Sequence, residues 1–335
     1  PSAAHRDRLA DDFAFIKKQG VFIFMGLVLM IGVSMQSLRT IRRLAVFGFL
    51  CAFAGVVLTY VVGDATKGAA RWIKFAGFSL QPSEFIKPVF IVVTAWLLDA
   101  NKRIEDFPGM TLAVGLFLLT ALSVFGQPDL GMTVLISGVW ALQMVWAGIP
   151  VWLIMTLFSA GLVLVTGSYF FLAHVRDRID RFLASENEIG SQIQKSMDAF
   201  ANGNLLGRGP GEGYVKMTLP DVHTDFIFAL AGEECGVWLT TIIVAAFAAI
   251  VVRSMTLSMR DNNLFVMYAA SGLAASLGGQ AIVNMCSALQ LMPAKGMTLP
   301  FVSYGGSSML ASCLAMGMLL AITRKNAAAE DKDNG

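Results

Sequence analysis

Nine runs of apolar residues, each long enough to cross a lipid bilayer as a helix, divide this sequence. A transmembrane helix needs about 20 apolar residues, within a range of roughly 17–25. The runs cover residues 20–36, 44–63, 82–98, 109–126, 131–147, 150–174, 224–252, 263–288 and 303–323. Backbone groups in lipid must form hydrogen bonds within their own structure, and the sequence lacks the alternating pattern of a transmembrane barrel. We therefore predict an all-α polytopic membrane protein, with a single membrane domain over residues 1–335 that contains nine visible transmembrane helices.

The low content of charged residues leads to the same conclusion. They make up 14% of the chain, whereas a soluble protein carries about 25%, so the apolar surface must face lipid. The net charge of +2, without a basic arm or a nucleic-acid motif, argues against a nucleic-acid partner. The four cysteines form no CxxC pair and the three histidines have no metal-ligand spacing, so we expect neither a disulfide framework nor a zinc site.

Lysine and arginine residues in short loops predict which helix ends face the cytoplasm. One alternate set of loops holds Arg39, Arg42, Arg43, Lys102, Arg103, Arg253, Arg260, Arg324, Lys325 and Lys332. The opposite set holds Lys67, Arg71, Lys74, Lys295 and six cations of the longest loop. The bias is weak by count, but three short loops and the C-terminal tail agree, so we assign the first set to the cytoplasm. We expect residues 326–335 to be a disordered cytoplasmic tail, and the outer cations to bind an anionic ligand.

The longest connection, residues 175–222, is predicted to be a large extracytoplasmic loop with a function, because loops beyond about 12–15 residues rarely serve only as connections. Ser191 and Gln194 fit a capping box, and apolar residues follow at helical spacing. Gly203 is placed to end this helix. We therefore expect an amphipathic helix at the outer membrane interface.

Four carboxylates lie in or beside apolar runs. Asp225 is placed where the long loop enters the seventh run; either it or Thr224 caps the helix, or Asp225 acts as a general base. Glu233 and Glu234 lie about two turns deeper, where hydrogen bonding or ion pairing with another helix is the simpler interpretation for at least one of them. Glu84 is three residues before Lys87 on one helix face, so these two can form an ion pair, although Lys87 can also reach an anionic headgroup.

Several outer segments combine cations with glycine or aromatic residues. Arg71, Trp72 and Lys74 share a short loop, where the tryptophan is most simply a membrane anchor and the cations can bind phosphate. Residues 207–213 are glycine-rich and include Arg208; they form a tight turn or a backbone cradle for a diphosphate. Lys295 lies in a turn before the last run, and the small residues that follow Ser303 are typical of close helix packing.

These same stretches resemble the SEDS family of cell-wall polymerases (shape, elongation, division and sporulation). The matching stretches are residues 68–72, 81–84, 127–131, 219–234 and 293–308. They extend over nearly the whole chain in the order of the family. Residues 293–300, with the sequence PAKGMTLP, are more similar to the division members of the family than to its elongation members. Family members have ten membrane helices, and the head of this chain resembles the first outer loop, so we expect the first helix to be missing and the N-terminus to lie outside.

The resemblance implies a peptidoglycan glycosyltransferase of the bacterial cytoplasmic (inner) membrane, acting at the division septum. Its substrates would be lipid II and the undecaprenyl-diphosphate-linked glycan chain, joined by an inverting single displacement. Asp225 matches the essential carboxylate of the family and would be the general base. Transition-state charge on the leaving diphosphate would be stabilised by Arg71, Lys74, Lys295 and Arg208. A divalent cation (Mg²⁺ or Mn²⁺) is an optional helper, and no other cofactor is implied.

The remaining candidate residues follow from the same resemblance. Trp72 matches an outer-loop tryptophan that contacts sugar or lipid headgroup. His223, close to Asp225, and Ser303, at the start of the last run, complete the substrate-binding candidates together with Lys87. Glu84, Glu233 and Glu234 are expected to serve structure or a polar pathway. The implied partner is a class B penicillin-binding protein of the FtsI type, alongside other division proteins.

Two other functions stay open at this point. A lipid II flippase would use the intramembrane carboxylates as a polar path, although the sequence shows no convincing internal repeat of the kind common in transporters. A non-catalytic division scaffold would need surface contacts only, and would leave Asp225 and the outer cations without a role.

Overall fold

The structure is a computed structural model. It describes residues 14–62, 64–66, 69–75, 78–127, 129–171, 176, 189–214, 222–289, 291–292 and 296–324. Lys295 and the predicted tail 326–335 lie outside the described residues, as does much of the long loop.

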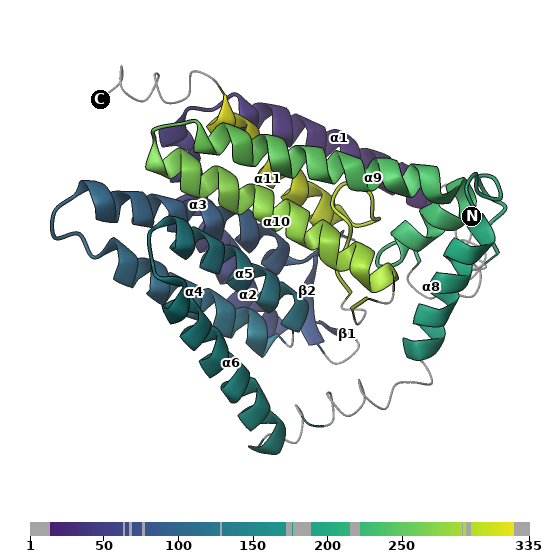
Figure 1. Cartoon of the computed structure of the whole chain (residues 1–335), viewed down its shortest axis with the longest axis horizontal. Helices are drawn as coiled ribbons and strands as arrows, with labels where there is room; N and C mark the ends of the chain where they lie inside the picture. The colour runs from purple at the N-terminus through teal and green to yellow at the C-terminus, as the bar shows by residue number, and fades with distance from the viewer. Residues whose placement is uncertain are drawn as a thin grey trace.

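Each of the nine predicted runs coincides with a long helix in the described part of the chain (Figure 1). The helices are α1 Ala14–Ser34, α2 Leu38–Val62, α3 Pro82–Arg103, α4 Gly109–Gly126, α5 Leu130–Trp146, α6 Val151–Phe171, α9 Ile227–Met259, α10 Leu264–Ala288 and α11 Gly306–Thr323. By length and composition, six of them are able to cross a membrane, namely α1, α2, α4, α9, α10 and α11. The α-helical membrane bundle predicted from the sequence is confirmed.

Helices α3 and α10 form the centre of this bundle. They pack against each other; α3 also contacts α2, α4, α5 and α11, and α10 also contacts α5, α9 and α11. In α10, 72% of the span is buried, whereas only 11% of the α1 span is buried, although the sequences of both helices are apolar. Outer helices therefore present apolar side chains to lipid, and α6 diverges from the bundle in Figure 1.

A small antiparallel sheet between α2 and α3 was not predicted, and corrects the purely α-helical description. Its strands are β1 Asp64–Thr66, β2 Ala69–Phe75 and β3 Phe78–Leu80, in the order β1-β2-β3. Asp64 pairs with Trp72, and Lys74 pairs with Ser79. β1 and β3, with three residues each, are too short for alternation to be informative, and the sequence AARWIKF of β2 does not alternate between apolar and polar residues. The sheet holds the predicted Arg71–Lys74 segment in an extended conformation.

The amphipathic helix of the long loop is α8 Ile189–Gly203. It ends at Gly203 as predicted but begins at Ile189, so Ser191 lies inside the helix and the predicted capping box is wrong. The rings of Phe200 and Phe228 pack with centroids 5.6 Å apart, and the Ser196 hydroxyl donates a 2.7 Å hydrogen bond to the carbonyl of Ala288. Helix α8 therefore packs against α9 and the end of α10.

Helix α9 is broken at Gly236, and a loop fills the break. Gly236 has φ +80° and ψ −175°, far from helical values. The backbone N–H groups of Arg208 and Gly209 donate 3.0 Å hydrogen bonds to the carbonyls of Glu233 and Glu234, and the N–H of Val237 donates to the carbonyl of Asn204. Backbone groups that the broken helix leaves without helical partners are therefore satisfied by residues 204–209, as burial in a membrane protein demands.

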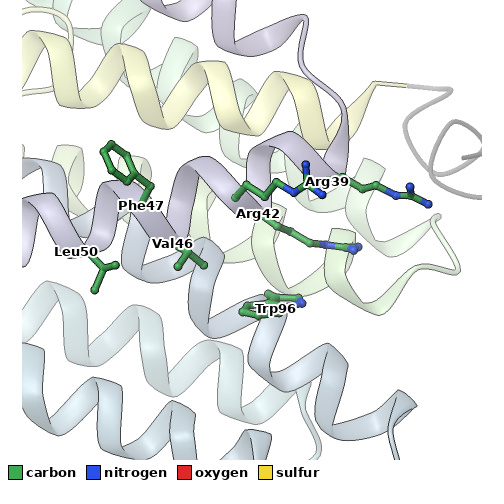
Figure 2. A pocket seen from close by; sticks show the side chains of 7 residues that line it. Arg39, Arg42, Val46, Phe47, Leu50 and Trp96 are labelled. Atoms are coloured by element: carbon green, nitrogen blue, oxygen red, sulfur yellow. The ribbon is translucent and has the colours of Figure 1, made fainter. Parts of the chain in front are cut away.

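The two ends of the bundle differ in charge. Arg39, Arg42 and Arg43 begin α2, Lys102 and Arg103 end α3, and Arg260 and Arg324 follow α9 and α11. We call this the arginine end; Figure 2 shows Arg39 and Arg42 there. The opposite end, which carries the sheet, α8 and the start of α9, is the sheet end. The two alternate sets of loops predicted from the sequence therefore lie at opposite ends of the bundle.

We predict that Gly236→Ala destabilises the protein by about 2–4 kcal/mol, because a positive φ is strained for alanine and clashes add to that cost. A Cβ atom on Gly236 would lie 2.4 Å from the carbonyl oxygen of Leu205. The change is measured as a lower melting temperature of the detergent-purified protein. Gly115→Ala in α4 is the matched control, since its Cβ meets no atom within 4 Å. Equal melting temperatures of Gly236→Ala and Gly115→Ala would show that the break in α9 does not require glycine at residue 236.

Candidate functional site

Asp225 lies in a turn directly before α9. The helix begins at Ile227 with Phe226 at the N-cap position, so neither Thr224 nor Asp225 occupies the cap that the capping interpretation requires. The predicted seventh run began at residue 224, three residues earlier than the helix does. Asp225 is half-buried at the sheet end of the bundle, and its carboxylate is carried by the turn of residues 222–226.

Three consecutive carbonyls of this turn accept hydrogen bonds from other parts of the chain. The N–H of Tyr304 donates to the His223 carbonyl at 2.9 Å, and the Ser303 hydroxyl donates to the Thr224 carbonyl at 2.5 Å. The Asn284 amide of α10 donates to the Asp225 carbonyl at 3.0 Å. The backbone that carries the carboxylate is thereby fixed to α10 and to the segment before α11, residues 296–304.

The segment of residues 296–304 passes directly beside the carboxylate. A Cβ atom on Gly296 would lie 3.5 Å from Asp225 Oδ2. The Asn284 amide also donates to the carbonyl of Met297 at 2.7 Å, so one side chain joins both segments. Gly296 directly follows Lys295, which itself lies outside the described residues. The structure thus brings the chain next to Lys295 to Asp225.

Ser303 and Tyr304 hold the site together. Ser303 is buried, and its hydroxyl also accepts from the N–H of Leu299 at 2.8 Å, so the side chain predicted to bind substrate is occupied in holding the turn. Burial raises the pKa of the Tyr304 phenol above its ordinary value, so this side chain is neutral at physiological pH. His223 is half-buried in the same turn.

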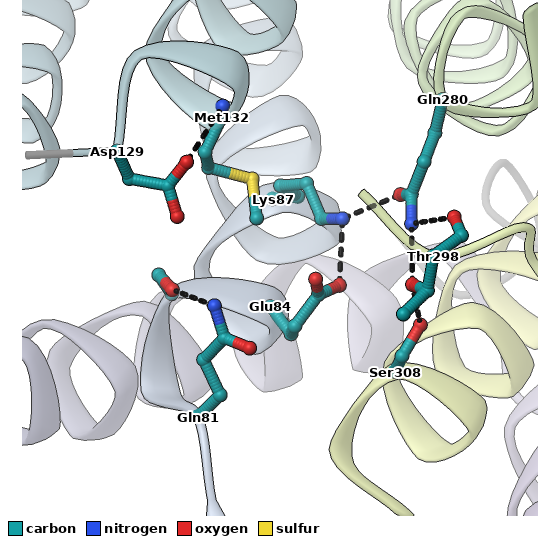
Figure 3. Close-up of polar contacts among 9 residues, drawn as sticks. Gln81, Glu84, Lys87, Asp129, Met132, Gln280, Thr298 and Ser308 are labelled. Carbon is teal, nitrogen blue, oxygen red and sulfur yellow. Dashed lines mark hydrogen bonds and ion pairs between the residues drawn. The ribbon is translucent and has the colours of Figure 1, made fainter. Parts of the chain in front are cut away.

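A buried polar network lies between α3, α10 and the segment 296–304 (Figure 3). Lys87 Nζ is 2.7 Å from Glu84 Oε2, which confirms the predicted pair, and it also donates to Gln280. The Gln280 amide donates to the Thr298 carbonyl at 2.9 Å, and Thr298 and Ser308 share a hydrogen bond. Because Lys87 is buried and bonded within α3 and α10, the structure supports its role in packing over its predicted reach to a headgroup.

Arg71 is also paired. Its Nη1 is 3.2 Å from Asp129 Oδ2, and its Nε donates to the Gln127 carbonyl at 3.0 Å. Asp129 is buried and caps α5 by accepting from the N–H of Met132 at 3.1 Å. Arg71 therefore joins the sheet to the α4–α5 turn, and part of its charge is already compensated. Trp72, half-buried, points to the opposite face of β2 because side chains alternate along a strand.

The glycine-rich residues 207–213 do not form the predicted diphosphate cradle. Their N–H groups at Gly207, Arg208, Gly209 and Glu212 donate to backbone carbonyls of Gly203, Glu233, Glu234 and Gly209. These donors are required by the broken helix α9 and by the turn itself. The exposed Arg208 side chain donates to the Asn202 side chain at 3.2 Å.

Glu233 and Glu234 lie under this loop. Glu233 is fully buried, and its Oε1 accepts from the N–H of Tyr214 at 2.9 Å. The predicted hydrogen bonding is therefore observed for Glu233, although its partner is the loop rather than a helix. Glu234 is half-buried beside Gly213.

Metal ligands do not gather in the part of the chain that the structure describes, where no group of three or more His, Cys, Asp or Glu side chains is placed to hold an ion. The divalent cation considered from the sequence remains a prediction.

Four residues of the site were not predicted from the sequence, namely Gln280, Asn284, Thr298 and Tyr304. Gln280 and Asn284 did leave a signal, because two amides four residues apart lie on one face of a largely apolar helix. Polar side chains inside a membrane are costly without partners, so such a pair predicts contacts with another polar segment. Thr298 and Tyr304 form hydrogen bonds with Gln280 and His223, which are distant in the sequence and are brought close only by folding.

Known proteins are similar to this chain over most of its length. A family model described as "Cell cycle protein", for FtsW, RodA and SpoVE, matches residues 2–328. The chain is 42% identical over 325 residues to the probable peptidoglycan glycosyltransferase FtsW of Caulobacter vibrioides, covering 97% of this chain and 83% of that relative. It is 37% identical to the protein of the same name from Geobacter metallireducens, covering 94% of this chain and 86% of that relative.

Solved structures share the fold. A chain from a structure described as "Structural coordination of polymerization and crosslinking by a peptidoglycan synthase complex" has a TM-score of 0.78 and 26% identity, covering 93% of this chain and 90% of that chain. The rod shape determining protein RodA of Thermus thermophilus has a TM-score of 0.69 and 25% identity, covering 94% of this chain and 89% of that chain.

We predict that Arg71→Gln destabilises the protein by about 1–3 kcal/mol, because it leaves the buried Asp129 carboxylate without its cation. The cost is below that of a fully buried pair, since the Arg71 side chain is 20% exposed. Thermal unfolding of Arg71→Gln, Asp129→Asn and the double variant measures the coupling. The double variant should lose less than the sum of the single losses; strictly additive losses would show that the pair does not contribute to stability.

Proposed function

Because this chain belongs to the cell cycle protein family of FtsW, RodA and SpoVE, the SEDS family, we propose that it is a peptidoglycan glycosyltransferase of the FtsW type. Its proposed reaction polymerises lipid II into glycan strands at the outer face of the bacterial cytoplasmic membrane during cell division. Relatives that cover nearly all of this chain and are named probable peptidoglycan glycosyltransferase FtsW support this activity.

The observation that carries the proposal is the fixed turn around Asp225. Three carbonyls of this turn accept hydrogen bonds from Tyr304, Ser303 and Asn284, so the backbone that carries the carboxylate is held at one position at the sheet end. A general base must be positioned within hydrogen-bond reach of the proton it removes, and a rigid support provides that position. The segment after Lys295 passes beside it, which supports a cation near the same point.

In the proposed reaction, Asp225 accepts the proton of the 4-hydroxyl on the incoming lipid II. That oxygen forms a bond to the anomeric carbon of the lipid-linked chain as the bond to its diphosphate breaks. The leaving group is undecaprenyl diphosphate, and a single displacement inverts the configuration. Charge that develops on the diphosphate is stabilised by cations, for which Lys295 is our first choice.

The other proposed substrate contacts have less support. Arg71 is partly compensated by Asp129, and Arg208 contacts Asn202, so both would have to share their charge with the diphosphate. Lys74 lies in β2, but its side chain is outside the described residues. Trp72 and His223 are half-buried at the same end and are proposed to contact the sugar or the lipid headgroup. A bound Mg²⁺ or Mn²⁺ would supply further positive charge to the diphosphate.

We also propose that the arginine end faces the cytoplasm and that the protein acts at the division septum. The gathering of cations at one end supports this orientation. The proposed partner is a class B penicillin-binding protein of the FtsI type, a transpeptidase. The similarity to a chain of a peptidoglycan synthase complex that coordinates polymerization and crosslinking supports such a partner.

The flippase and scaffold hypotheses are less well supported. Of the carboxylates that suited a polar path, Glu84 is paired with Lys87, which also donates to Gln280, and Glu233 accepts from the N–H of Tyr214, as expected for packing. A scaffold leaves the fixed carboxylate without a role.

We predict that Asp225→Asn abolishes lipid II polymerisation, with a loss of at least about 100-fold, because asparagine cannot accept the proton. Glycan strands are measured on gels with purified protein and its transpeptidase partner. Asp198→Asn is the matched control, because Asp198 is an exposed carboxylate on α8 and loses the same charge. Activity retained by Asp225→Asn at the level of Asp198→Asn would rule out the general-base role.

We predict that Lys295→Gln weakens lipid II binding about tenfold, the effect of losing one charge-assisted contact to the diphosphate. Binding is measured by titration of the detergent-purified protein with lipid II. Lys102→Gln at the arginine end is the control, and should bind as the unchanged protein does. Undiminished affinity of Lys295→Gln would remove this residue from the diphosphate site.

A further inference from the structure

A groove of about 490 Å³ lies at the arginine end of the bundle, and the residues that line it are shown in Figure 2. Its polar part is formed by Arg39, Arg42 and Arg43 at the start of α2. Its wall is apolar and consists of Val46, Phe47 and Leu50 of α2 and Trp96 of α3. Charge at one end and an apolar wall below it match an amphiphile with an anionic head.

The residues of α2 that line the groove extend over a length close to that of one lipid leaflet. Helix residues rise about 1.5 Å each, so Arg39 and Leu50 are separated by roughly 16 Å along α2. Half of a hydrocarbon core of about 30 Å is roughly 15 Å. Phe47 and Leu50 are 67% and 61% exposed, so the wall is open to an acyl chain. A lipid with its phosphate at the arginines would therefore lay its chain along this wall.

The charges at the top of the groove favour an anion. The first turn of α2 contains no acidic residue, and Arg39 lies in it at the positive end of the helix dipole, where a cation is unfavourable. An anion bound there would be attracted both by the arginines and by the helix terminus. The acidic group on the neighbouring helix, Asp99 of α3, is 2.8 Å from Arg103 Nε and is also close enough to Arg42 to interact electrostatically.

Arg42 differs from its neighbours in the groove. Its guanidinium lies 4.3 Å from the centre of the Phe265 ring at the start of α10, so it is directed toward the bundle. Arg43 is exposed and Arg39 is half-buried. These two side chains are therefore better placed than Arg42 to contact a headgroup.

We propose that this groove is a binding site for an anionic phospholipid of the leaflet at the arginine end. Arg39 and Arg43 bind the phosphate, and Phe47, Leu50 and Trp96 contact an acyl chain. The site goes beyond the proposed glycosyl transfer: it lies at the other end of the bundle and takes a membrane lipid rather than the substrate.

The experiment is lipid titration of the delipidated, detergent-purified full chain, followed by native mass spectrometry. The probes are dioctanoyl phosphatidylglycerol and the zwitterionic dioctanoyl phosphatidylcholine. Arg39→Gln/Arg43→Gln should weaken binding of phosphatidylglycerol at least tenfold. The matched control, Arg253→Gln/Arg260→Gln, removes the same charge from exposed residues of the arginine end that do not line the groove, and should stay within twofold of the unchanged protein.

A second variant, Leu50→Trp, places a larger side chain in the apolar part of the groove and keeps every charge. It tests lipid binding if the arginine variant fails to fold. It should weaken phosphatidylglycerol binding at least threefold. Phosphatidylcholine binding as tight as phosphatidylglycerol binding, or an equal loss in the Arg253→Gln/Arg260→Gln control, would overturn the site.

Two compounds that compete with phosphatidylglycerol test whether the bound phosphate belongs to a phospholipid, a soluble anion or another lipid. Inorganic phosphate at a hundredfold excess should leave the lipid bound; displacement by it would overturn the lipid in favour of a soluble anion. Undecaprenyl phosphate should compete more weakly than phosphatidylglycerol, and tighter binding of it would overturn the assignment to a phospholipid. Polymerisation by the arginine variant tests the glycosyltransferase separately, since the groove contains no residue of the Asp225 site.

Discussion

The hydrogen bonds that Tyr304, Ser303 and Asn284 donate to three consecutive carbonyls fix the position of Asp225. A turn at the mouth of a membrane helix has few helical bonds of its own, so its shape depends on such external donors. Each bond contributes only about 0.5–1.5 kcal/mol net, but together they set one geometry for the backbone. The orientation of the carboxylate, and with it the proposed chemistry, depends on these three contacts.

The donors are in turn supported from the centre of the bundle. Thr298, in the same segment as Ser303 and Tyr304, is bonded to Gln280, and Gln280 is bonded to Lys87. A buried network of this kind is stable only when its members are satisfied, and in a low-dielectric interior its bonds reinforce one another. The charged pair in α3 is therefore linked through Gln280 to the segment that passes beside Asp225.

Much of this architecture could be predicted from the sequence, because a bilayer sets the length and polarity of every span. The nine helices and the candidate Asp225 follow from that constraint. The sheet around Trp72 did not, because β1 and β3 are too short for a periodic signal and β2 does not alternate between apolar and polar residues. Of the two alternatives for residues 207–213, the tight turn rather than the diphosphate cradle is observed, because the break at Gly236 takes up the N–H groups of Arg208 and Gly209. A break at a single residue leaves no periodic signal in the sequence. The roles of Lys295 and Asp225 stay predictions.

The broken helix also bears on how the chain is assembled. An ordinary transmembrane helix satisfies its own backbone and can enter the bilayer before the rest of the protein folds. Helix α9 cannot do so around Gly236, because the carbonyls of Glu233 and Glu234 are bonded to residues that precede the helix in a separate loop. The backbone at this break is therefore completed only when residues 204–209 have docked against it.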